Sequence, residues 1–306
     1  MDNNSGPNLI LVKTALDKLF TGEMIDQART GKATALDPVV FTQDSAYNAA
    51  VVSSVEGGGG YFQTTTNDVP VVANADVTAA ALRTTLVLNF NQNLAISRTF
   101  MADQQLSAVS KAVRQRASAF AASRDRNAFN VFNNGFTTQT TIDGVAIYSN
   151  SHVNQNGDTV DNLETGTLSD SNLNIAVNSL RTQLGQSGVI EGYEPDYLLT
   201  PSIIHQTGMA VAKSVLKAGT GNNDLNYFSE MYPGMKVVYS PFLTSTTAWF
   251  IGAKNAGIMR FERESFFSEL VDWRYQPNDQ YLYKMRAREA VDSIYYNGLV
   301  GSNGTV

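Results

Sequence analysis

The chain has 306 residues, a formal net charge of −6, 43% hydrophobic and 16% charged residues, and no cysteine. This apolar content allows a sizeable core and excludes general disorder. The absence of cysteine excludes disulfides, thiolate catalysis and Cys-ligated metals. The acidic charge argues against a dedicated nucleic-acid-binding domain, because phosphate contacts need clustered Lys and Arg. No apolar run approaches the roughly 20 residues that cross a bilayer, and no signal peptide is evident, so we expect no membrane partner.

The N-terminal third changes from helical to strand-like character. Residues 9–28 space apolar side chains such as Leu16 and Phe20 at helical intervals, which predicts an amphipathic arm whose apolar stripe needs a partner surface. Residues 31–38 form a linker. From residue 39 to 98, β-branched and aromatic residues predict strands around 51–52, 69–72 and 84–90.

A glycine run lies between the first two of these strands, in the stretch Glu56, Gly57, Gly58, Gly59, Gly60, Tyr61, Phe62. A phosphate-binding loop would place Lys and Ser or Thr directly after its last glycine, whereas here two aromatic residues follow. The run therefore indicates the flexible tip or a bend of a long hairpin.

The longest helical pattern covers residues 103–134. Apolar residues recur at spacings of three and four, Asp103 is the expected N-cap, and Gly135 follows the expected C-terminus. Such a helix spans roughly 45 Å. Its opposite face is basic, which usually indicates a solvated or salt-bridged surface. The basic residues are Lys111, Arg114, Arg116, Arg124 and Arg126.

The second half alternates strands and helices, which indicates a compact α/β unit. A turn at Asp143-Gly144 is followed by a polar loop over 149–170, and Ser169 or Asp170 caps a helix over 173–184. A strand over 197–200 precedes a helix from Pro201 to Lys217, and a flexible loop covers 219–224. Short strands are predicted at 235–239, 249–252 and 258–261. Residues 266–296 alternate with period two, as in a long strand with one solvated face, and a polar tail occupies 298–306.

Catalytic signatures are scarce in this sequence. The two histidines, His152 and His205, lack partners at metal-ligand spacing, and no nucleophile elbow or zinc-protease motif occurs. We expect no enzyme activity, no cofactor and no metal, and a structural role for His152. A hydrolase that uses a loop site near His152, with Asp158 and Asp161 close in sequence, is kept as an alternative.

The order of these elements resembles the major capsid proteins of tailed bacteriophages with the Hong Kong (HK) type fold. In that family a Ser near a strand end precedes an Asp that opens the spine helix, and an Asp and an Asn-Gly pair close it. The matching residues are Ser97, Asp103, Asp125 and Asn134-Gly135. Four stretches are similar to Mu-like head subunits, namely 143–149, 198–201, 237–243 and 249–251.

The resemblance implies an α+β fold with four parts. These are an N-terminal arm (1–37), an extended β loop with its base (38–100), a peripheral domain with the spine helix (101–164), and an axial α/β domain (165–257). The last stretch (258–306) supplies strands that return to the peripheral domain and a C-terminal tail. We expect contacts between subunits at the loop and on the spine helix. The candidate residues are Glu56, Gly57, Gly58, Tyr61, Phe62, Arg114, Arg124 and Arg126.

The function that the resemblance implies is self-assembly into hexamers and pentamers of an icosahedral head. The partners would be many copies of the chain, a scaffolding protein, a portal and possible decoration proteins, with double-stranded DNA enclosed without sequence-specific binding. The location would be the virion, assembled in the host cytoplasm. The short segment before the arm favours a separate scaffolding protein or prior cleavage. An encapsulin-type nanocompartment shell, which encloses cargo enzymes, is the same-fold alternative.

Overall fold

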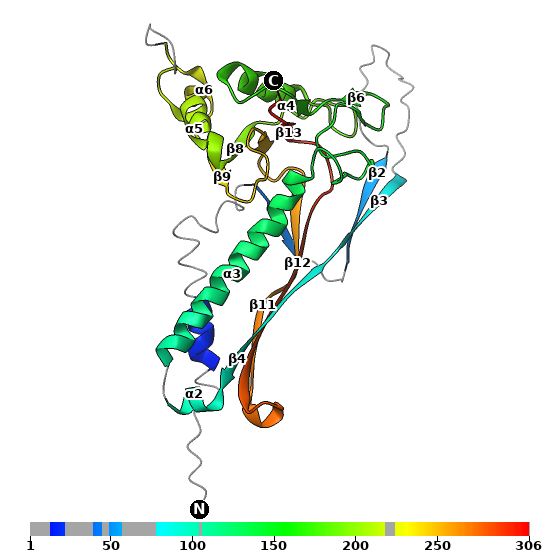
Figure 1. The fold of residues 1–306 in the computed structure, drawn as a ribbon. Helices are drawn as coiled ribbons and strands as arrows, with labels where there is room; N and C mark the ends of the chain where they lie inside the picture. The colour runs from blue at the N-terminus through cyan, green and yellow to red at the C-terminus, as the bar shows by residue number, and fades with distance from the viewer. Residues whose placement is uncertain are drawn as a thin grey trace, which may run out of the picture.

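Two β-sheets joined by one long helix organise the protein (Figure 1). The structure is a computed structural model that describes residues 13–21, 39–44, 49–56, 78–103, 106–217 and 224–305. The expected α+β architecture is confirmed, with the long helix running from an elongated lower part to a broader upper part. The predicted strand at 69–72 and loop at 219–224 lie wholly or mostly outside the described residues.

A four-stranded sheet with the order β1-β11-β12-β4 forms the elongated part. Its members are β1 (Phe41–Asp44), β11 (Ile258–Val271), β12 (Gln280–Ser293) and β4 (Leu88–Ser97). The antiparallel pair β11 and β12 is joined through the short 3-10 helix η2 (Trp273–Tyr275). The single strand expected over 266–296 is wrong, because 266–271 belong to β11 and the chain turns through η2 before β12. The period of two is confirmed along β12, since Tyr281, Tyr283 and Met285 are buried while Arg286 is exposed.

The spine helix α3 (Leu106–Asn133) covers one face of this sheet and buries Val109, Val113 and Ala117 against it. The predicted N-cap is wrong. Asp103 instead closes a short preceding helix, α2 (Arg98–Ala102), through its backbone N–H to the Thr99 carbonyl at 2.9 Å. Its φ of −78° and ψ of 8° continue that helical turn, whereas an N-cap residue is extended.

The described part of the arm, residues 13–21, is helical, and it packs on its own chain. Leu16 and Phe20 are buried in the same cluster as the spine helix, and the Phe20 ring stacks on Phe266 with centroids 4.1 Å apart. Asp17 accepts hydrogen bonds from Tyr283 at 2.6 Å and from Ser268. The stripe needs a partner surface, as expected, and for these residues β11 and β12 of the same chain supply it.

A five-stranded sheet with the order β7-β13-β10-β8-β9 forms the broader part. Its members are β7 (Leu163–Glu164), β13 (Leu299–Ser302), β10 (Trp249–Ala253), β8 (Pro195–Pro201) and β9 (Lys236–Ser240). The helices α4 (Asp170–Thr182), α5 (His205–Lys213) and α6 (Tyr227–Met231) pack around it. The Ser169 cap is confirmed by its bond from the Asn172 N–H, but the helix expected to reach Lys217 begins after η1 (Ser202–Ile204) and ends at Lys213.

The predicted C-terminal tail is wrong. Residues 299–302 form β13, a central strand of the five-stranded sheet, with Leu299 and Val300 fully buried. The glycines that indicated a tail serve close packing, since a Cβ on Gly301 would lie 2.6 Å from the Tyr148 ring. The chain end thus returns to the sheet that contains β8 and β10, not to the four-stranded sheet.

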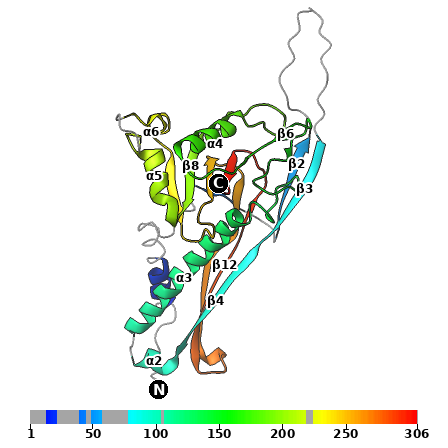
Figure 2. The same cartoon turned by 45° about the horizontal axis from the view of Figure 1, so that its top comes forward.

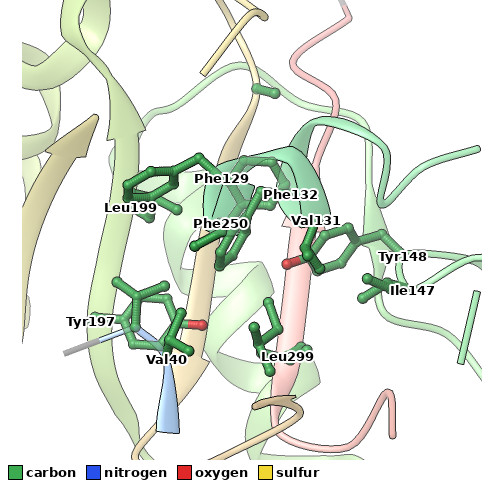
Figure 3. Close-up of a cluster of buried hydrophobic side chains, with 14 residues drawn as sticks. Val40, Phe129, Val131, Phe132, Ile147, Tyr148, Tyr197, Leu199, Phe250 and Leu299 are labelled. Carbon is green, nitrogen blue, oxygen red and sulfur yellow. The ribbon is translucent and has the colours of Figure 1, made fainter. Parts of the chain in front are cut away.

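The region between α3 and α4 is held by short pairings. The turn at Asp143-Gly144 is confirmed by a bridge between Thr140 and Ala146 and by a Gly144 φ of +79°. The stretch expected to be a loop contains two-residue strands, β5 (His152–Val153), β6 (Thr159–Val160) and β7. One hydrophobic cluster then joins the end of α3 to the five-stranded sheet, with the Phe132 and Phe250 rings 5.3 Å apart (Figure 3).

Candidate assembly surfaces

The strands β2 (Ala49–Glu56) and β3 (Thr78–Leu86) form an antiparallel hairpin that leaves the body beside the five-stranded sheet (Figure 2). This is the extended β loop that the sequence predicted. Glu56 is its last described residue on the outgoing strand. The other loop candidates, Gly57, Gly58, Tyr61 and Phe62, lie outside the described residues.

A buried ion pair fixes the root of this hairpin. The ladder between β4 and β12 ends at Leu88 and Glu289, and only Val87 separates β4 from β3. Beyond that point Arg83 binds both oxygens of Asp292 at 3.0 Å, and the Thr85 hydroxyl donates to the same carboxylate at 2.5 Å. Bidentate pairing of this kind fixes direction as well as distance, so side chains hold β3 where the sheet no longer does.

Neither Arg83 nor Asp292 was singled out from the sequence. One signal was present, because Arg83 is the single charged residue between positions 78 and 97. A lone charge in a neutral strand needs a specific partner once it becomes partly buried. The identity of that partner, more than 200 positions away, requires the structure.

The basic residues of α3 divide into two groups. Arg124 is committed within the chain, where it lies 2.5 Å from Glu289 and 3.5 Å from Glu262. Burial lowers the pKa of the Arg124 guanidinium, but its bond to Glu289 and the charges of Glu289, Glu262 and Asp125 together raise the pKa overall. Arg124 thus has partners within its own subunit, and a role in contacts between subunits stays a prediction. Arg114 and Arg126 are exposed and form no ion pair with a described residue.

Exposed apolar side chains are frequent on and beside α5, α6 and β9, and these elements lie near one another at one side of the broader part (Figure 1). Seven of the 14 large hydrophobic residues exposed in the described chain lie between positions 203 and 239. We call this set the apolar edge. It consists of Ile203, Met209, Val215, Leu216, Leu225, Met231 and Tyr239. A concentration of this kind marks a surface that another molecule covers.

His152 is a structural residue. Its side chain is fully buried, its Nδ1 lies 2.7 Å from an Asp143 oxygen, its Nε2 lies 3.1 Å from the Ile147 carbonyl, and its ring stacks on Tyr296. Burial raises the pKa of the Asp143 carboxyl, but hydrogen bonds from His152, Thr141 and Val145 outweigh burial and lower it overall. Both ring nitrogens are engaged within the chain and the side chain has no exposed surface, which favours the structural role expected for His152.

The described residues contain no group of three His, Asp or Glu side chains placed to hold a metal ion. None of the described helices combines the length and apolar character that a bilayer span requires.

Comparison with known proteins identifies the family. The model of the phage capsid protein family matches residues 84–300, which is more than half of the chain. No curated protein sequence matches the chain significantly.

Solved structures share the fold at low sequence identity. The capsid of Myoviridae phage XM1 is similar with a TM-score of 0.52 and 14% identity, covering 88% of this chain and 91% of that one. The capsid of an empty GTA particle is similar with a TM-score of 0.56 and 11% identity, covering 90% of each chain. A virus-like particle from Pyrococcus furiosus is similar with a TM-score of 0.55 and 7% identity, covering 93% of this chain and 98% of that one. With its spine helix, extended hairpin and two sheets, this chain belongs to the phage capsid protein family and is a structural subunit with the HK-type capsid fold.

Proposed function

We propose that the protein is the major head subunit, which assembles into hexamers and pentamers of an icosahedral shell that encloses double-stranded DNA. Membership of the phage capsid family supports this role. The elongated shape of the described part of the chain also supports this role (Figure 2). Many modest contacts per subunit, repeated over a closed lattice, give a stable shell while each contact stays reversible during assembly.

Within this proposal the five-stranded sheet and its helices form the axial domain. The four-stranded sheet and α3 form the peripheral domain, and the β2–β3 hairpin is the extended loop. The axial domain was expected to be one continuous stretch, 165–257. Because β13 is a strand of the five-stranded sheet, this domain also includes residues 299–302. The apolar edge carries the proposal, since it places uncovered hydrophobic side chains on the domain that meets its neighbours around the capsomer axis.

Other partners follow from the same role. A scaffolding protein, a portal and decoration proteins would complete the particle, which would be assembled in the host cytoplasm. A nanocompartment shell that encloses enzymes is the second candidate. Its support is the shared fold with the virus-like particle from Pyrococcus furiosus, while the match to the phage capsid family favours a viral head.

Electron microscopy of the purified full chain, expressed with and without its scaffold, tests the proposal. We expect closed shells, or at least hexamers, from the unaltered chain, and monomers alone would refute the proposal.

A matched pair of variants tests the apolar edge. Ile203→Asp places a charge at a side chain that is 71% exposed on the edge, and Ile175→Asp makes the same change at one that is 51% exposed on α4. Neither should affect folding. Only Ile203→Asp should reduce assembly, because it buries a charge in the capsomer contact. Equal assembly by both variants would remove the edge from the proposal.

A further inference from the structure

The exposed face of α3 is cationic over much of its length. Four basic side chains on it are exposed, namely Lys111, Arg114, Arg116 and Arg126. The helix contains a single acidic residue, Asp125, which is buried. None of the four cations forms an ion pair with a described residue. In a chain of net charge −6, this face is a local reversal of sign.

Helical geometry places these cations around one surface. At 3.6 residues per turn, Lys111 and Arg126 lie near the middle of the exposed face, with Arg114 and Arg116 on its two sides. The outer pair along the axis, Lys111 and Arg126, is separated by roughly 22 Å. Between them the exposed positions are the uncharged polar Gln115 and small residues such as Ser118, Ala119 and Ala122, in addition to Arg114 and Arg116, so no large apolar side chain keeps a partner away from the charges.

The composition of this face differs from that of a contact between protein copies. None of the large exposed hydrophobic residues of the described chain lies on α3, whereas seven lie on the apolar edge. Protein interfaces bury aromatic and aliphatic side chains at their centre. Phosphate backbones are bound by Arg, Lys and small hydroxyl side chains instead. Duplex DNA carries about one negative charge per 1.7 Å of its axis, so a 22 Å row of cations meets many phosphates in any register.

We propose that the cationic face of α3 is the surface that contacts the phosphate backbone of the enclosed duplex DNA, without reading its sequence. This inference rests on the proposed function, because it requires the helix to face the interior of the shell. Four side chains on each of many subunits give weak, salt-sensitive contacts. Such contacts hold the outermost duplex against the wall and let it slide while it is packed.

Binding of random-sequence duplex DNA to the full chain tests the proposal. Fluorescence anisotropy with a duplex of about 24 base pairs, between about 50 and 200 mM salt, gives the slope of log K against log salt. The variant Lys111→Gln/Arg126→Gln should reduce that slope by about 2, and affinity at 100 mM salt by roughly 50-fold, since each lost phosphate contact removes about 0.9 from the slope. Adding Arg114→Gln and Arg116→Gln should nearly double the loss of slope.

The matched control is Lys236→Gln/Lys254→Gln, which removes the same charge from exposed positions outside α3. It should leave the slope within about 0.5 of the unaltered chain. An equal loss of slope in both pairs would overturn the proposal, because binding would then depend on net charge alone.

Electron microscopy of the same variants separates the remaining outcomes. Normal shells with a reduced salt slope support the proposal. Lost shells with an unchanged slope would overturn it and make the face a contact between copies. If the unaltered chain forms no shells, the proposed function fails, whatever the slope shows.

Discussion

The two ends of the spine helix have different surroundings. At the C-terminal end Ala128, Phe129, Val131 and Phe132 are all buried, while Asn130 is exposed, so a wide face of the helix packs into a core (Figure 3). Over the N-terminal half, Val109 and its stripe are buried while the opposite face is exposed. One continuous helix therefore begins on a two-layer structure and ends with a wider face against a core.

This difference separates stability from assembly. The part of the helix with the wider buried face contributes mainly to folding, because most of its apolar side chains lose contact with water. A helix on one face of a sheet leaves its other face for partners. The subunit is thus anchored at the C-terminal end of α3, where both sheets meet, and it presents surfaces toward the N-terminal end.

The largest effect is expected at the enclosed end. Phe132→Ala removes a fully buried ring that packs against Phe250, and it should lower the free energy of unfolding by about 4 kcal/mol, because the close-packed site cannot collapse around the cavity. Urea denaturation followed by tryptophan fluorescence measures this loss, with Trp249 fully buried in the neighbouring cluster. A loss below about 1 kcal/mol would contradict the close packing described for the C-terminal end of the helix, and the two ends would then not differ in packing.

A smaller effect is expected midway along the helix. Arg124→Ala leaves the carboxylate of Glu289, whose side chain is 2% exposed, without its cation. This should cost about 3 kcal/mol, because an unpaired buried charge is strongly destabilising. The double variant Arg124→Met/Glu289→Leu should recover most of the loss in the same urea assay. If the single variant unfolds like the unaltered protein, the ion pair does not join α3 to β12 in the way described.

On the open half of the helix we expect about 2 kcal/mol. Phe120 is half-buried, with its ring 5.9 Å from Phe20 and 5.7 Å from Phe266. Phe120→Ala removes the ring from one side of this cluster, and exposure to solvent reduces the cavity cost compared with Phe132→Ala. The same denaturation assay compares the two directly. A loss at Phe120 as large as that at Phe132 would contradict the distinction between the two halves.

The sequence predicted those elements whose signal is local. The spine helix and the strand period of β12 follow from apolar spacing, and the Ser169 cap follows from the residue type. Two predictions were wrong because their cause is tertiary. Asp103 is a good N-cap by type, yet the preceding turn already uses it. The polar, glycine-rich C-terminus became β13 because Gly301 leaves room for the Tyr148 ring.

The assembly surfaces were less predictable than the fold. The basic face of α3 was visible as a pattern, but the sequence could not show that Arg124 is paired with Glu289 while Arg114 is not. The apolar edge had no sequence signature, because its residues come from three elements and intervening loops, and each alone looks like an ordinary exposed side chain. Such surfaces exist only once the elements are packed together.

The smallest effect is expected where the arm meets the sheet, and it depends on pH. Burial raises the pKa of the Asp17 carboxyl, but hydrogen bonds from Lys13, Ser268 and Tyr283 outweigh burial and lower it below the usual 3.8. The hydrogen bonds to Asp17 therefore contribute fully to stability above pH 3.8, and their contribution is lost as pH falls through the lower pKa of the folded protein.

Asp17→Asn should lower the free energy of unfolding by about 1 kcal/mol at neutral pH. In urea denaturation the gap between this variant and the unaltered chain should begin to narrow as pH falls below 3.8 and close below the lower pKa of the folded protein, where both side chains are neutral. A gap that stays constant with pH would show that the charge of Asp17 does not hold the arm, and that the stacked rings of Phe20 and Phe266 dock it alone.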